Sequence, residues 1–98
     1  MSGLLPLGTI VYLKEGKIKL MIVSRQPVLK NDEGEFYYDY AAISQIIGLE
    51  PNRVVYFNQE NISKVFFKGY VSEDDDIIQQ ALIDWRNEHP EIKKGKIE

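Results

Sequence analysis

The chain has 98 residues, of which 44% are hydrophobic and 28% are charged, and its formal net charge is −3. This length and composition are typical of one small globular domain. The absence of cysteine excludes disulfides and thiolate metal sites, and the negative charge disfavours sequence-independent binding of nucleic acid. Because there is neither a signal-like start nor a run of about 20 apolar residues, we expect a cytoplasmic protein that binds no membrane.

The first half of the chain has the pattern of strands separated by turns. β-Branched and aromatic residues predict a strand at 9–13, and alternation of apolar and polar residues predicts a second at 18–25. Pro27 argues against a continuation of the second strand. The charged segment 30–35, with an Asn-Asp pair and a glycine, then predicts a turn that leads into a third strand at 36–40.

An aromatic run occupies this third strand. Alternation predicts that Phe36, Tyr38 and Tyr40 face the core, while Tyr37 and Asp39 face solvent. Aromatic rings can also stack on nucleic acid bases, but such platforms normally lie in a basic groove. Since acidic residues surround this run, we interpret it as mainly structural and expect no binding of nucleic acid.

The second half contains two further strands and a helix. Residues 41–53 are compatible either with a short helix closed by a glycine or with a strand that runs into a turn. Strands are predicted at 54–57 and 64–70, with a single helical turn at 58–61 between them. A helix is predicted at 72–88, because Ser is a good N-cap and a proline follows the helix end.

The predicted helix is amphipathic. Its apolar stripe consists of Ile77, Ile78, Ala81, Leu82 and Trp85. We expect this stripe to pack on the sheet. The acidic residues 73–76 at its start are explained by the helix dipole, although they could also bind a cation or a basic partner.

These elements predict an α+β fold: a small curved antiparallel sheet, or partial barrel, of about five strands with one C-terminal helix packed on it. The globular domain is expected to span residues 1–90. Residues 91–98 contain too few apolar side chains to bury and are expected to form a flexible tail.

The sequence contains none of the common catalytic motifs, and its single histidine is at the predicted helix end. Glu35 and Asp39 could serve as an acid and base in a hydrolase, but most acidic chains contain such pairs. We therefore predict that the chain is not an enzyme and has no cofactor or bound metal. A protein partner is the expected ligand, and the oligomeric state is left open.

Three stretches together resemble one bacterial family. They are residues 5–13 with the Lys-Leu-Met-Ile segment at 19–22, the Tyr-Asp-Tyr element at 38–40, and residues 57–62 leading to 65–70. The chain is similar to domains of unknown function encoded beside LXG polymorphic toxins and type VII secretion genes in Gram-positive bacteria. It departs from their pattern after Tyr40, where a tyrosine-proline-glycine loop is usual, and at Gln59, where a histidine is usual.

This resemblance implies a non-catalytic protein-binding module, namely an accessory chaperone or adaptor for a type VII secreted LXG toxin. The alternative is an immunity protein that neutralises a toxin domain, because small acidic proteins can cover basic catalytic surfaces. Loops on a rigid sheet commonly hold recognition residues. The candidate partner-binding residues are therefore Tyr37, Asp39, Gln45, Glu50 and Asn52.

Overall fold

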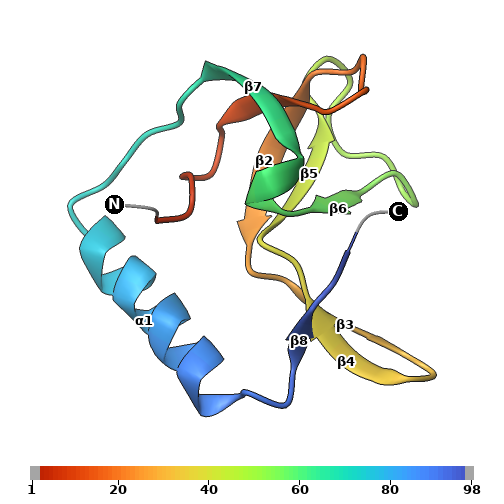
Figure 1. Cartoon of the computed structure of the whole chain (residues 1–98). Helices are drawn as coiled ribbons and strands as arrows, with labels where there is room; N and C mark the ends of the chain where they lie inside the picture. Colours follow the sequence, from red (N-terminus) through yellow and green to blue (C-terminus); the bar gives the residue numbers. More distant parts are fainter. Residues whose placement is uncertain (1–2, 97–98) are drawn as a thin grey trace.

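The computed structural model describes residues 3–96. In chain order its elements are β1 (Ile10–Leu13), β2 (Leu20–Arg25), β3 (Val28–Asn31), β4 (Gly34–Tyr37), β5 (Tyr40–Ser44), β6 (Val55–Phe57), the 3-10 turn η1 (Gln59–Asn61), β7 (Ile62–Phe67), α1 (Asp75–Glu88) and β8 (Lys93–Lys94). Figure 1 shows a curved sheet with α1 to one side and the β3–β4 hairpin with β8 below it. The α+β class predicted from the sequence is confirmed.

A five-stranded antiparallel sheet holds the core. Its strand order is β6-β5-β2-β1-β7, and η1 connects the two edge strands β6 and β7 in the chain. Register shifts interrupt the pairing of β1 with β7 and of β2 with β5, and such irregularities bend strands. The core cluster consists of Leu4, Val11, Leu20, Ile22, Tyr40, Ala42 and Phe57. The sheet is therefore curved, and it is open because β6 and β7 at its two edges do not pair with each other.

A second, three-stranded sheet has the order β3-β4-β8. The sequence pattern misses β3, because Pro27 argues against a strand there. The chain instead bends at Gln26, whose φ is 57°, and β3 starts after the proline. The turn at the hairpin tip is of the expected kind: the Asn31 side chain accepts a hydrogen bond from the Glu33 amide, and Gly34 has a φ of 125°.

The tail also differs from its expectation within the described residues. Lys93 and Lys94 form β8, which pairs parallel with β4 in the register Phe36 to Lys93. The Gly95 amide then donates to the Tyr37 carbonyl at 2.6 Å. Main-chain hydrogen bonds order this segment, so a low apolar content is a poor guide to it. Residues 97–98 of the predicted tail lie outside the described part.

Residues 41–53, for which the sequence allows either a helix or a strand, form a strand followed by turns. β5 ends at Ser44, and its side-chain Oγ accepts hydrogen bonds from the amides of Ile46 (3.2 Å) and Ile47 (3.1 Å). Gly48 then bridges back to Ser44 with a φ of 91°. A second turn contains Asn52, whose φ is 66°. The strand alternative is therefore correct, and the segment presents a closely turned loop.

α1 begins at Asp75, three residues after the predicted start, because the Ser72 carbonyl forms a preceding turn by accepting a hydrogen bond from the Asp75 amide at 3.1 Å. Its orientation is the larger difference. Ile77 and Ile78, from the predicted inward stripe, are 69% and 45% exposed. Leu82 is the stripe residue that packs against the core. The expectation that the whole stripe covers the sheet is wrong.

Polar side chains hold α1 in this orientation. The Gln79 amide group pairs with both main-chain groups of Leu4, at 3.0 and 2.7 Å, much as a neighbouring strand would. Asp75 binds Arg25 at 3.0 Å. The side chain of Gln26 donates to the Leu82 carbonyl at 3.0 Å. The N-terminal segment thus lies against α1, as Figure 1 shows.

Candidate protein-docking surfaces

Asp39, which the alternation predicts to be exposed, is only 4% exposed. Its carboxylate accepts a hydrogen bond from the Gln59 amide at 2.9 Å and pairs with the Lys94 ammonium at 2.9 Å. Its own amide donates to the Asn58 side chain, which in turn donates to the Gly95 carbonyl. Asp39 therefore anchors the C-terminal segment to η1, and little of its side chain is left for a partner.

The reason for this error is local. Residues 38 and 39 lie between β4 and β5, so one alternation does not run through the whole aromatic run. Tyr40 is buried as predicted, whereas Tyr38 is only half-buried. Tyr37 is half-buried too, and its ring meets that of Trp85 edge-on with centroids 6.0 Å apart. Tyr37 thus contributes mainly to the contact between β4 and α1.

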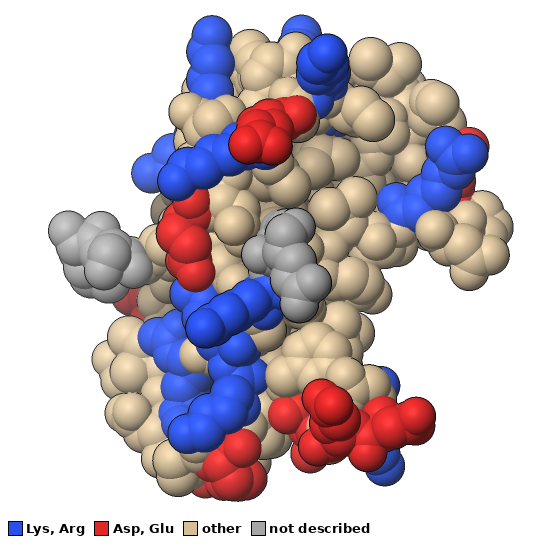
Figure 2. All heavy atoms as spheres, turned by 45° about the vertical axis from the view of Figure 1, so that its right-hand side comes forward, with Lys and Arg blue, Asp and Glu red and all other residues tan. Residues whose placement is uncertain are grey.

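Lys94 is shared by two carboxylates. Burial works against its charge, but the hydrogen bond and charge of Asp39, followed by those of Glu60, outweigh burial and raise the pKa of Lys94. The pKa of Glu60 is lowered, first by its own backbone amide and then by Lys94 at 3.3 Å. Figure 2 shows Lys and Arg side chains in a column over this C-terminal segment, with carboxylates above and below.

A cavity of about 440 Å³ lies beside this network, between the N-terminal segment, α1 and the C-terminal segment. Gln79, Arg86 and Lys94 contribute to its lining. Each of these side chains is engaged in holding the chain together: Gln79 with Leu4, Arg86 with Gln26 at 3.1 Å, and Lys94 with Asp39. Within residues 3–96, no three His, Asp or Glu side chains are grouped to hold a metal ion.

The predicted loop residues form part of a surface at the other end of the molecule. We define the loop surface as Ile18, Ile46, Ile47 and Leu49, which are 61%, 78%, 65% and 72% exposed. The β1–β2 loop and the loop after β5 lie side by side, since the Gln45 amide donates to the Lys19 carbonyl at 2.8 Å. Four large aliphatic side chains are therefore presented to solvent by two adjacent loops.

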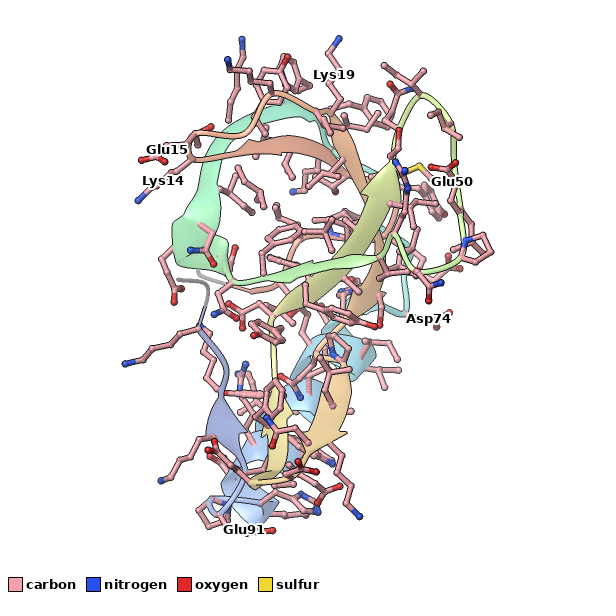
Figure 3. The ribbon with its side chains drawn as sticks, turned by 90° about the vertical axis from the view of Figure 1, so that its right-hand side faces the viewer. Lys14, Glu15, Lys19, Glu50, Asp74 and Glu91 are labelled. Carbon is pink, nitrogen blue, oxygen red and sulfur yellow. The ribbon has the colours of Figure 1, made fainter. Side chains whose placement is uncertain are left out.

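Charged groups surround the loop surface. Figure 3 labels Lys14, Glu15, Lys19 and Glu50 around this end of the sheet. Glu50 lies 3.9 Å from Arg53, a long ion pair across one turn. The cations of this end are Lys14, Lys17, Lys19 and Arg53, against the acids Glu15 and Glu50. The two loops thus carry four cations and two acids beside their aliphatic residues, and the Lys19 ammonium lies over the Phe66 ring of β7.

Of the five candidate partner-binding residues, the structure groups three and separates two. Gln45 and Asn52 are exposed and Glu50 is partly exposed, all within the loop that carries Ile46, Ile47 and Leu49. Tyr37 ends β4 and Asp39 follows it in the link to β5, next to α1 and β8. The aliphatic residues of the loop were not predicted from the sequence as part of a binding surface. Two isoleucines directly before a glycine turn were the feature of the sequence that could have indicated it.

The outward side of α1 is a second apolar surface. We define the helix surface as Ile77, Ile78 and Ala81, all exposed. A shallow groove runs along it, and its lining residues are Asp76, Ile77, Gln80, Ala81 and Asp84. This surface is flanked by carboxylates, in contrast to the loop surface.

A family model for Domain of unknown function (DUF4176) matches residues 4–78, which cover the whole five-stranded sheet, the β3–β4 hairpin and the first turn of α1. The chain belongs to this family. Comparisons with curated proteins and with solved structures found no match. In the described part of the chain, no helix has the length and apolar character needed to cross a membrane.

Proposed function

We propose that this DUF4176 chain is a non-catalytic protein-binding module, which serves as a chaperone or adaptor for a toxin substrate of type VII secretion. The observation that carries the proposal is the loop surface, where four aliphatic side chains are each more than 60% exposed. Two adjacent loops carry these side chains, and large exposed apolar patches typically mark protein interaction sites.

The local structure of the loop supports a binding role. The side chain of Ser44 fixes the amides of Ile46 and Ile47, and Gly48 closes the turn against Ser44. A loop that is already ordered loses less conformational entropy when a partner binds than a disordered one does. The aliphatic residues of this ordered loop would therefore bind a partner with a smaller entropic penalty than the same residues in a disordered loop.

The class of partner comes from the resemblance to domains encoded beside LXG toxins. The excess of cations over acids in the two loops favours a partner that carries acidic residues beside its apolar surface. Asp39, the carboxylate considered for acid–base chemistry, is bound by Lys94 and by the Gln59 amide. This engagement supports the non-catalytic part of the proposal.

The experiment is co-expression with an LXG toxin of the kind that the resemblance implies, followed by separate pull-downs of its N-terminal targeting region and C-terminal toxic domain. We expect retention of the N-terminal region, and loss of that retention in Ile46→Ser/Ile47→Ser. The control Val28→Ser changes an exposed residue of β3, outside the loop, and should bind normally. Binding to the toxic domain alone would contradict the adaptor and favour an immunity protein. Binding to neither region would contradict both.

A further inference from the structure

We propose that the helix surface is a second docking site, and that it takes a basic amphipathic segment of a partner protein. This inference deepens the proposed adaptor function, because a protein that links two others needs two separate surfaces. The binding itself does not depend on the identity of the toxin, so the two proposals can fail independently.

The first step of the argument is the orientation of α1. The helix contacts the rest of the chain through Asp75, Gln79 and Leu82, which recur at the spacing of one helix face, and through the Trp85 ring against β4. Ile77 and Ile78 are consequently left 69% and 45% exposed. Polar side chains hold this helix together with Leu82 and Trp85, while the two isoleucines are largely exposed.

The second step is the groove. Ile77, Ala81 and Asp84 lie at successive helical spacings and share its lining with Asp76 and Gln80. The Gln80 amide donates to Asp84 at 2.9 Å, which holds that carboxylate beside the groove. The result is an apolar floor with a carboxylate toward each end of the helix, a form suited to an apolar segment that carries cations.

The third step is charge. Four carboxylates around this surface take part in no salt bridge within residues 3–96: Glu73, Asp74, Asp76 and Asp84. The helix dipole stabilises acids in the first turn, but the effect falls off along the helix and does not account for Asp84. Like charges at this density attract cations and repel acidic partners. A basic segment therefore fits this surface better than an acidic or neutral one.

The test uses the full chain and a designed helical peptide with leucines on one face and lysines on the other. A matched peptide has glutamates in place of the lysines. Affinity is measured by fluorescence anisotropy of the labelled peptide, and the contact surface by amide chemical shifts. We expect the lysine peptide to bind, the glutamate peptide to bind at least about tenfold more weakly, and the shifts to centre on residues 76–84.

Three double variants distinguish the causes. Ile77→Ser/Ile78→Ser should weaken the lysine peptide about tenfold or more, because it removes the apolar contact. Asp76→Asn/Asp84→Asn should weaken binding less and reduce its dependence on salt. The loop variant Ile46→Ser/Ile47→Ser should bind the peptide normally. Circular dichroism and thermal melts serve as the control for folding, and we expect each variant to be folded because the substituted positions are exposed.

Several results would overturn the proposal: no binding of the lysine peptide, equal binding of both peptides, or shifts centred on the loop surface. Concentration-dependent association of the chain with itself, abolished by Ile77→Ser/Ile78→Ser, would overturn it too, because a second copy would then cover the helix surface. A failed toxin pull-down together with normal peptide binding would contradict the toxin partner and leave the helix surface supported.

Discussion

The orientation of α1 can be tested by comparing two alanine substitutions in the same helix. Leu82 is partly buried against the core cluster, whereas Ile77 is 69% exposed. Leu→Ala in a full core costs roughly 2–5 kcal/mol, and Leu82 is only partly buried, so Leu82→Ala should cost about 2 kcal/mol.

Ile77→Ala should behave differently. It removes little buried surface, and alanine is the better helix former by a few tenths of a kcal/mol. The two effects nearly cancel, so the free energy of unfolding should change by less than about 0.5 kcal/mol.

Urea unfolding followed by circular dichroism gives both free energies, and thermal melts provide a second measure. About 2 kcal/mol corresponds to a fall in Tm of roughly 8–16 °C for a chain of this size. If Ile77→Ala cost as much as Leu82→Ala, or more, α1 would dock through its apolar stripe after all. If neither substitution changed stability, Leu82 would make no contact with the core.

Three further predictions concern ionisable groups. Lys94→Met removes the cation beside the Asp39 carboxylate, whose side chain is 6% exposed, and should cost about 2 kcal/mol in urea unfolding; an unchanged midpoint would contradict the anchoring role of this pair. Burial raises the pKa of Tyr40 from 10.0 to about 12, so the neutral phenol stabilises the fold fully below pH 10, and about 3 kcal/mol should be lost as the pH rises from 10 to 12. Tyr40→Phe should flatten that alkaline loss, whereas Tyr70→Phe, at a 79% exposed position, should not. The hydrogen bond from its arginine partner, followed by that from Gln79, lowers the pKa of Asp75; its carboxylate therefore stabilises the fold above its unfolded-state pKa, and that contribution is lost as the pH falls through the folded-state pKa. Asp75→Asn should show a smaller acid-induced loss than the unchanged chain, and an identical acid profile would contradict the ion pair.

Local pattern predicts the elements of the large sheet well. The predicted strands at 9–13, 18–25, 54–57 and 64–70 overlap β1, β2, β6 and β7, and the predicted helical turn between β6 and β7 is η1. Each of these segments has its own alternation or turn residues, so no distant contact is needed to specify it.

The errors occur where a distant partner determines the structure. The burial of Asp39 depends on Lys94 and on the Gln59 amide, 55 and 20 residues away in the chain, and no local pattern contains that information. β8 exists because β4 offers a free edge to Lys93 and Lys94. For the candidate site, the loop at 45–52 was predicted from its turn residues, but its aliphatic side chains were not recognised as the exposed part.

The helix error has a different cause, which bears on function. A stripe at helical spacing shows that α1 has an apolar side, but not what covers it. The sheet fills its own core with side chains such as Tyr40, Phe57 and Ile22, all fully buried. In a small domain, few core positions remain for an added helix. α1 therefore docks through Leu82, Trp85 and hydrogen-bonded polar groups, and Ile77, Ile78 and Ala81 of its apolar stripe are left exposed.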